Sequence, residues 1–285
     1  MLAPAESATG REEIEVAMRA AHRRWLQARH DELAAPESWL GLVGLFWLEP
    51  GINQVGSADG SLVHLPGGPA GLGELRWENG RVFWHPVAGE SRELQTDAAG
   101  QPSMVEHENW SFFIVDRDGH LAARLRDRDW AAGKPFAGLD YFAFDPAWRI
   151  EAEWQVLSPP LRMEVHNVSG ELKTVDVAHQ AVFQVAGQTV TLLPMSVNDK
   201  EIFFVFRDRT SGKETYGAGR FLKVPAATME TTAGPRVDGK ISLDFNRAYN
   251  PPCAFTPFAT CPLPPPENWL SFAVPAGEKK WVKAA

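Results

Sequence analysis

Two polar stretches of the sequence carry the side chains whose types and spacing could do chemistry. The first, FRDRTSGKETYGAGRFL, holds a carboxylate, a phenol and a guanidinium close together. If this stretch returns as a β-strand, Glu214, Tyr216 and Arg220 share one face, because side chains alternate across a strand. Gly217 and Gly219 then lie on the other face, where glycines are typical of a close approach by another backbone or by a ligand. A salt-bridged sheet surface is the structural alternative.

The second stretch, DFNRAYNPPCAFTPFATCPLPPPENW, begins where the strand-like run ISLDF ends. Hydrogen-bonding side chains follow one another at its start, namely Asp244, Asn246, Arg247, Tyr249 and Asn250. Pro251 and Pro252 fix their own φ and bias the preceding residue toward an extended shape. The pattern predicts a pre-organised pocket wall, because a stiff segment presents its side chains at fixed positions. Alternatively, the proline-rich arm only covers a sheet edge and blocks strand pairing.

Together the two stretches predict a small-molecule pocket, and the residue types suggest roles within it. Arg220 and Arg247 would bind a carboxylate or another small anion, because guanidinium groups match carboxylates bidentately. Asp244 or Glu214 would act as general base, and Tyr216 would orient the substrate or donate a proton. The remaining predicted substrate-binding residues are Asn246, Tyr249 and Asn250. The leading hypothesis is a small-molecule-binding protein, with a hydrolase acting on an anionic, carboxylate-bearing substrate as its catalytic form. The alternative is a non-catalytic binding or scaffold module whose polar residues are structural.

The two cysteines, Cys253 and Cys261, both lie in the proline-rich arm. Their spacing matches no common zinc pattern, and the eight histidines form no metal-binding pair, so no metal site is predicted. The interpretations of the two thiols, in order of preference, are a buried small hydrophobe, a redox pair and a nucleophile. No glycine-rich dinucleotide motif, Walker lysine motif or nucleophile elbow occurs, so no cofactor is expected.

Composition narrows the class of partner. The formal net charge is −8, which argues against nucleic acids and anionic lipid surfaces because no basic excess can displace counterions. No apolar run approaches the ~20 residues that a membrane span needs. The first residues lack the pattern of an export signal, so a cytoplasmic location with reduced thiols is expected. The expected partner is a small anionic molecule, and the sequence predicts no particular oligomeric state.

The periodicity predicts a mainly β protein that begins with a helix. Residues 10–33 carry an apolar stripe at steps of three and four, formed by Ile14, Met18, Ala21, Trp25 and Ala28. Strand-length runs separated by turns follow, with hairpin signals at Asn79-Gly80, Asp118-Gly119 and Glu49-Pro50-Gly51. They predict an antiparallel β sandwich or barrel, divided into two packed β subdomains. The predicted boundaries are 1–36 for the helix, 37–130 for the first subdomain and 131–285 for the second, which carries the arm and the site.

The two polar stretches also resemble a known family. FRDRTSGKETYGAGRFL with DFNRAYNPPCAFTPFATCPLPPPEN is similar to the signature of the bacterial domain of unknown function 1684, and SWLGLVGLFWLEPGINQVGS is similar to that family's opening. The resemblance implies a β-rich fold and a family-wide site built from both motifs, and it implies no known reaction. Its signature positions here are Arg207, Asp208, Thr210, Ser211, Gly212, Glu214, Thr215, Tyr216, Gly217, Gly219, Arg220, Asp244, Asn246, Arg247, Tyr249, Asn250, Cys253, Cys261, Glu267 and Asn268. A shorter segment, GINQVGSADGSLVHLP, resembles the first strands of forkhead-associated domains, as a likeness of β-hairpins rather than of function.

Overall fold

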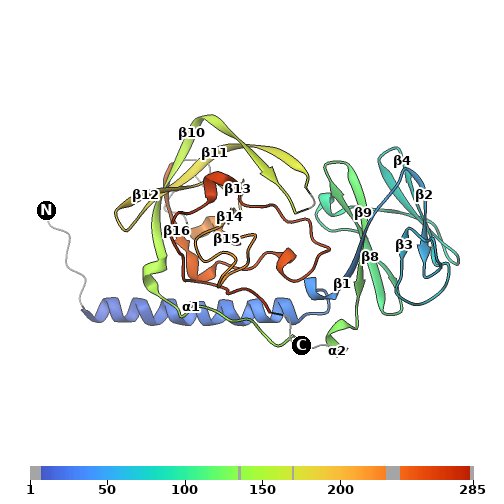
Figure 1. The fold of residues 1–285 in the computed structure, drawn as a ribbon, viewed down its shortest axis with the longest axis horizontal. Coiled ribbons are helices and arrows are strands. Elements are labelled where there is room, and N and C mark those ends of the chain that lie inside the picture. Colours follow the sequence, from blue (N-terminus) through green and yellow to red (C-terminus); the bar gives the residue numbers. More distant parts are fainter. Residues whose placement is uncertain (1–7, 134–135, 169, 229–237, 283–285) are drawn as a thin grey trace. The chain divides into compact units, whose positions relative to one another are not determined.

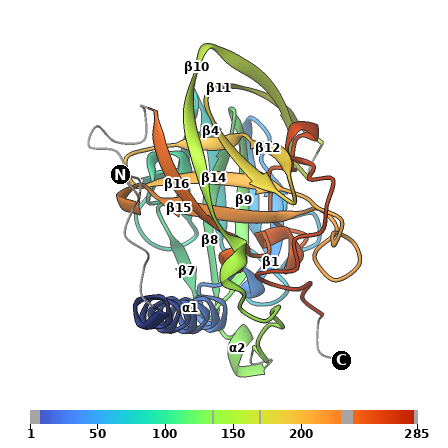
Figure 2. The same ribbon diagram turned by 90° about the vertical axis from the view of Figure 1, so that its left-hand side faces the viewer.

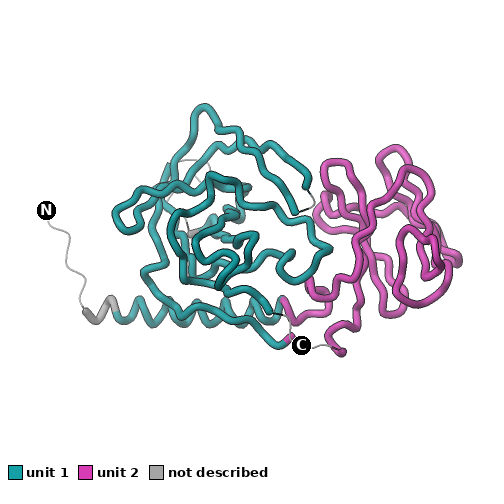
Figure 3. Tube along the Cα trace, viewed as in Figure 1, with its two compact units in different colours: residues 1–32, 137–285 teal, residues 33–136 magenta. Residues whose placement is uncertain are grey.

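The computed structural model describes residues 8–133, 136–168, 170–228 and 238–282 (Figure 1). The chain forms two compact units, one made of Met1–Glu32 with Ala137–Ala285 and the other of Leu33–Phe136 (Figure 3). The fold is mainly β, with an N-terminal helix followed by several antiparallel sheets, and none of the described sheets closes into a barrel. The predicted fold class is therefore confirmed.

The N-terminal helix α1 (Ala8–Ala34) runs along the larger unit (Figure 1). Its predicted apolar stripe is only half-buried, and Ile14 is 52% exposed. The side chains that α1 buries in its own unit are polar, namely His22 and Arg29. They lie seven residues apart and so on one helical face. The helix is therefore held by specific polar partners as well as by apolar contact.

The unit of residues 33–136 is a sandwich of two sheets around one core. One sheet has the order β1-β9-β8-β7 and the other β3-β2-β4-β5-β6. Trp84 of the second sheet meets Phe112 of the first edge to face, with ring centroids 5.4 Å apart. Its elements are η1 (Trp39–Gly41), β1 (Leu42–Trp47), β2 (Gly51–Gly56), β3 (Val63–His64), β4 (Gly73–Glu78), β5 (Arg81–Pro86), β6 (Arg92–Leu94), η2 (Asp97–Ala99), β7 (Val105–His107), β8 (Trp110–Arg117), β9 (His120–Asp127) and α2 (Trp130–Gly133).

Two of the three predicted hairpin turns are confirmed in this unit. Asn79-Gly80 joins β4 to β5 and Asp118-Gly119 joins β8 to β9, with positive φ at both residues of each turn. The prediction at Glu49-Pro50-Gly51 is wrong, because β1 pairs with β9 whereas β2 pairs with β4 and β3. The side chain of Asn53 binds the N–H and carbonyl of Glu49, each at 2.8 Å, and holds a bend that carries the chain from one sheet to the other.

The larger unit is also a sandwich, to which helix α1 and the C-terminal segment, residues 245–282, are added. Its sheets have the orders β12-β11-β10-β16 and β13-β14-β15. Figure 2 shows β14 and β15 running across the direction of β10. Beyond α1, its elements are η3 (Pro146–Trp148), β10 (Arg149–His166), β11 (Leu172–Val185), β12 (Gln188–Leu192), β13 (Pro194–Val197), β14 (Glu201–Phe206), β15 (Arg220–Pro225), η4 (Ala226–Thr228), β16 (Gly239–Asp244), η5 (Phe245–Arg247), η6 (Pro252–Ala254) and η7 (Pro266–Asn268).

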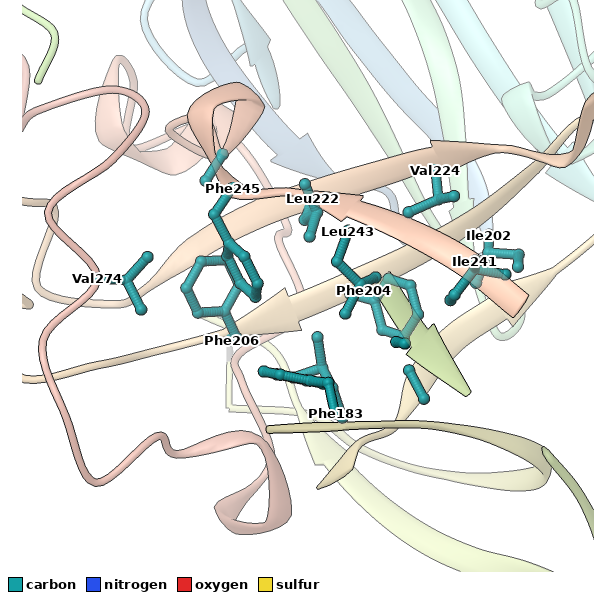
Figure 4. Packing of buried hydrophobic residues seen from close by; sticks show 14 of the residues in the cluster. Phe183, Ile202, Phe204, Phe206, Leu222, Val224, Ile241, Leu243, Phe245 and Val274 are labelled. Carbon is teal, nitrogen blue, oxygen red and sulfur yellow. The ribbon is translucent and has the colours of Figure 1, made fainter. Parts of the chain in front are cut away.

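Phenylalanines from both sheets and from the C-terminal segment fill the core of this unit (Figure 4). Phe206 of β14 meets Phe245, which follows β16, edge to face with ring centroids 5.4 Å apart. Both rings are fully buried, and burying such a side chain stabilises a fold by roughly 1.5–3 kcal/mol. Since Phe206 and Phe245 lie at the starts of the two polar stretches, this core fixes where both stretches leave the sheets.

Candidate functional site

The first polar stretch does not return as the predicted strand. Strand β15 begins only at Arg220, and residues 208–219 form a loop. The Oδ1 atom of Asp208 accepts hydrogen bonds from the N–H and the hydroxyl of Thr210, at 2.7 and 2.6 Å. The carbonyl of Thr210 in turn accepts the N–H groups of Lys213, Glu214 and Thr215. Short polar side chains that bind nearby backbone in this way compete with strand pairing. The alternation of side chains between two strand faces, on which the prediction depended, therefore does not occur in residues 208–219.

The two glycines of this loop differ in what surrounds them. Gly219 has φ +93°, and a Cβ there would lie 2.4 Å from the carbonyl oxygen of Phe206. A Cβ on Gly217 would have Gly212 as its nearest neighbour, at 3.7 Å. The predicted close approach of another backbone is confirmed at Gly219 and is wrong at Gly217. Gly219 lets the loop turn tightly against the end of β14 before Arg220 enters β15.

Arg220 forms a buried ion pair inside the larger unit. Its side chain has no exposed surface, and its Nη2 lies 2.8 Å from the Oδ2 of Asp208. The same nitrogen donates to the carbonyl of Val274 at 2.9 Å, and Nη1 donates to the carbonyl of Ala276. Burial lowers the pKa of Arg220, and the carboxylate of Asp208 opposes that effect. The guanidinium joins the loop, β15 and the C-terminal segment.

A second buried ion pair joins helix α1 to the C-terminal segment. The Nε atom of Arg29 lies 2.8 Å from the Oε1 of Glu278, which has no exposed surface. The Oε2 atom of Glu278 accepts the N–H of Asn250 at 2.6 Å, and Arg29 donates to the carbonyl of Asn250 at 3.1 Å. The amide of Asn250 donates to the carbonyl of Lys279 at 2.8 Å. Burial raises the pKa of Glu278, and Arg29 opposes that effect.

Neither Arg29 nor Glu278 was among the predicted site residues. The signal that could have indicated Arg29 is its position, because it stands four residues after Trp25 on the face of α1 that packs against the unit. A charged residue on such a face needs a buried partner. No comparable pattern surrounds Glu278 in the sequence.

The ring of Tyr249 lies against Arg29 of this second ion pair. Its backbone pairs with Phe221 of β15 through two hydrogen bonds of 2.9 Å. The guanidinium of Arg29 lies over its ring, 4.9 Å from the centroid, and the ring of Phe221 meets it edge to face. Burial raises the pKa of Tyr249, so its hydroxyl stays protonated at neutral pH. Tyr249 is thus part of the contact that seats α1.

Asp244, Asn246 and Arg247 form a third group at the end of β16. The Oδ1 atom of Asp244 accepts from the N–H and the amide of Asn246, at 3.2 and 3.0 Å. Asn246 also exchanges two hydrogen bonds with the backbone of Asp145, at 3.0 and 2.9 Å. The Nε atom of Arg247 lies 3.3 Å from the Oδ2 of Asp244 without hydrogen-bond geometry, and its side chain is 33% exposed. Of the two predicted anion-binding arginines, Arg247 is the accessible one.

His22 of α1 faces this third group. Its ring lies 5.0 Å from that of Phe144 and 5.9 Å from that of Trp25, and its Nδ1 has no hydrogen-bond partner among the described residues. Burial lowers the pKa of His22, while Asp244 raises it and Arg247 lowers it. The imidazole is therefore neutral in the folded protein at neutral pH.

Because burial lowers the pKa of His22, we expect the folded protein to lose stability in mild acid. A lowered folded-state pKa means that the unfolded chain binds the proton first, so stability is present above pH ~6.5 and falls as the pH drops below it. In His22→Phe, whose ring suits the same aromatic neighbours, we expect a flatter dependence. Melting temperatures of both proteins from about pH 8 to about pH 5 test this. Parallel curves would show that His22 does not contribute.

The last two predicted residues lie apart from these groups. Tyr216 donates its hydroxyl to the carbonyl of Cys253 at 2.9 Å, and Glu214 is exposed, with its carbonyl accepting the N–H of Lys280. The contacts of the described residues thus divide the predicted site residues among separate sets of partners. A cavity of about 230 Å³ involves none of them and is lined by Ala137, Gly138, Leu139, Asp140, Lys280, Trp281 and Val282. Within the described residues, no three His, Cys, Asp or Glu side chains are placed to share a metal ion.

The chain matches one known protein family over about half of its length. Residues 134–279 match the model of the family described as "Protein of unknown function (DUF1684)", which is just over half of the sequence. The chain belongs to the DUF1684 family. The match covers both polar stretches and both buried ion pairs except for Arg29. In this member of DUF1684, no helix that the structure describes is long and apolar enough to cross a membrane.

The DUF1684 chain is also similar to a solved structure. This is an uncharacterized protein of Haloarcula marismortui determined by solution NMR, with 33% sequence identity, a TM-score of 0.41, and coverage of 50% of this chain and 77% of that one. No curated protein matches the chain.

Proposed function

We propose that this protein is a non-catalytic, β-rich binding module whose family signature residues are mainly structural. The observation that carries the proposal is the state of Arg220. Its guanidinium has no exposed surface and faces Asp208 and the carbonyls of Val274 and Ala276. A substrate-binding arginine must have donors that a ligand can reach, whereas both Nη atoms of Arg220 donate to the protein itself and its Nε, which has no partner among the described residues, is buried.

The other predicted catalytic groups also support a structural role. Asp244 accepts two hydrogen bonds from Asn246 and faces Arg247, so its proton-accepting oxygens are engaged. Glu214 is exposed on a loop, and its side chain has no hydrogen-bond partner among the residues that the structure describes, while the hydroxyl of Tyr216 binds the carbonyl of Cys253. A general base must lie within hydrogen-bond reach of both its substrate and the group that orients it. This arrangement favours binding over hydrolysis.

Arg247 is the residue at which we propose that a small anion binds. Its side chain is 33% exposed, so a ligand can reach part of it, whereas its Nε is a buried atom beside Asp244 with no hydrogen-bond partner among the described residues. Asp244 holds it on one side and thereby limits its rotamer freedom before binding. A carboxylate suits this fork because two parallel N–H donors can meet its two oxygens.

A thermal-shift titration with small carboxylates tests this proposal. Ten millimolar of a ligand with a Kd of one millimolar stabilises a folded protein by about 1.4 kcal/mol. We expect this gain in stability, seen as a rise in melting temperature, in wild type and not in Arg247→Met. Without ligand, the melting temperature of Arg247→Met should differ from that of wild type by only a few degrees, because the ion pair is partly exposed. Arg162→Met is the matched control, since Arg162 is a far more exposed arginine of the same unit. An equal shift in wild type and Arg247→Met would exclude Arg247 as the binding residue.

A further inference from the structure

The two thiols of the proline-rich arm are neighbours in space. The N–H of Cys253 points at the Sγ of Cys261 at 3.3 Å, although seven residues separate the two along the chain. Neither cysteine forms a disulfide. The arm therefore closes a small loop that brings the thiol of Cys261 against the backbone of Cys253.

Backbone contacts hold both ends of this loop. On one side, the carbonyl of Cys253 accepts the hydroxyl of Tyr216 at 2.9 Å, and Cys253 lies within helix η6, which Pro251 and Pro252 begin. On the other side, the carbonyl of Cys261 accepts the N–H of Val168 at 3.0 Å. Two cysteines held close together in this way react as an intramolecular pair, without the entropic cost of bringing two free chains together.

The surroundings give the two thiols different characters. Cys253 is half-buried and can be reached from solvent, whereas Cys261 is buried. The hydrogen bond from Cys261 lowers the pKa of Cys253, burial opposes this, and the hydroxyl of Tyr216 lowers it further. Burial raises the pKa of Tyr216, so its phenol remains a proton donor. Since the thiolate is the reactive form, Cys253 is the thiol suited to attack and Cys261 the thiol suited to resolve.

We propose that Cys253 and Cys261 form a thiol–disulfide exchange site that takes oxidising equivalents from a small disulfide of the glutathione class. The Cys253 thiolate attacks one sulfur of the small disulfide, whose S–S bond breaks, and the departing thiolate takes up a proton. Cys261 then loses its proton and attacks the Cys253 sulfur, which expels the second small thiol. Two protein thiols and one small disulfide become one protein disulfide and two small thiols, with two electrons passing to the small molecule.

Tyr216 is a positioning residue in this site. Its hydroxyl donates to the Cys253 carbonyl at 2.9 Å and so fixes the backbone that carries the thiol, and its presence beside Cys253 lowers the pKa of that thiol. The side chain does not exchange electrons. This role explains a tyrosine in the first polar stretch without assigning it any step of hydrolysis.

Mass spectrometry of the full reduced chain, incubated with oxidised and reduced glutathione at several ratios, tests the proposal. We expect wild type to lose two hydrogen atoms, with peptide mapping assigning the new bond to Cys253 and Cys261. Cys261→Ser should retain one glutathione on Cys253, because the resolving thiol is missing. Cys253→Ser should stay unmodified, because Cys261 is buried. Circular dichroism of each variant checks that it folds.

A second measurement separates the role of Tyr216 from a merely structural one. In the Cys261→Ser background, Tyr216→Phe should slow adduct formation on Cys253 roughly three- to tenfold near neutral pH, and alkaline pH should restore the rate because the thiolate then forms without help. A slower rate at every pH would mean that Tyr216 only supports the fold. The proposal as a whole is overturned if native wild type keeps both thiols under oxidising glutathione, or if the bond forms only in urea. It does not depend on anion binding at Arg247.

Discussion

Arg220→Met is expected to lower the free energy of unfolding of the larger unit by about 3–5 kcal/mol. The methionine keeps much of the aliphatic stem, but Asp208 then remains buried without its counter-charge. The carbonyls of Val274 and Ala276 lose their donor at the same time. An unpaired buried carboxylate accounts for most of the loss, because its desolvation is no longer offset.

Urea titration monitored by circular dichroism measures this effect, and Arg247→Met is its matched control. That second arginine also pairs with an aspartate, yet its side chain is 33% exposed, so water can solvate what the substitution uncovers. We expect a loss below about 1 kcal/mol there. Arg220→Lys should recover only part of the stability, because a single ammonium cannot reproduce a planar fork that meets three acceptors. Similar small losses in Arg220→Met and Arg247→Met would contradict the structural role of Arg220.

Arg29→Met is the second change expected to cost about 3–5 kcal/mol. It removes the counter-charge of Glu278, which has no exposed surface, and it removes the cation that lies over the ring of Tyr249. We expect helix α1 to become sensitive to limited proteolysis, since Arg29 is its main polar attachment. Arg19→Met on the same helix removes an exposed cation that pairs with Glu15 and lies 5.1 Å from the centroid of the Phe144 ring, and the helix should then remain protected.

The pH dependence of Arg29→Met distinguishes a stranded carboxylate from simple loss of packing. Burial already raises the pKa of Glu278, and removal of Arg29 takes away the largest opposing effect. A carboxyl whose folded-state pKa is raised favours the folded protein at low pH, and that advantage is lost as the pH rises through the folded-state pKa. The deficit of the variant should therefore shrink as the pH is lowered from about 8 toward about 5. A deficit that is constant across this range would assign the loss to packing.

Local features of this fold could be predicted from the sequence, and contacts between distant segments could not. Asn79-Gly80 determines its hairpin because both residues accept positive φ, and no distant segment is needed. The ETYGAGR stretch alternates like a strand, but Asp208 and Thr210 reorganise it into a loop through bonds that alternation does not reveal. Its end at Gly219 was predictable as a close approach, although the approaching group is the Phe206 carbonyl rather than a ligand.

The partners of the predicted site residues were the hardest part to anticipate. The sequence predicts that Arg220 and Arg247 lie in one pocket, and two arginines that face each other need negative charge between or beside them. Asp208 and Asp244 supply that charge from within the protein, and of these only Asp244 was a predicted site residue. Composition and spacing reveal that a charge must be balanced, but the choice between an internal carboxylate and a bound anion depends on the packed structure.

The ion pair between Arg29 and Glu278 has a consequence for biosynthesis. Its members are 249 residues apart, so the arginine is added to the growing chain roughly 12–50 seconds before its partner, at typical elongation rates. During that interval the helix has no carboxylate to hold it, and the larger unit lacks the segment that closes its core. We expect arrested nascent chains ending before Glu278 to expose α1 to protease, and chains long enough to release Glu278 from the exit tunnel to protect it. Folding of the larger unit would then be completed only after Glu278 has emerged from the exit tunnel.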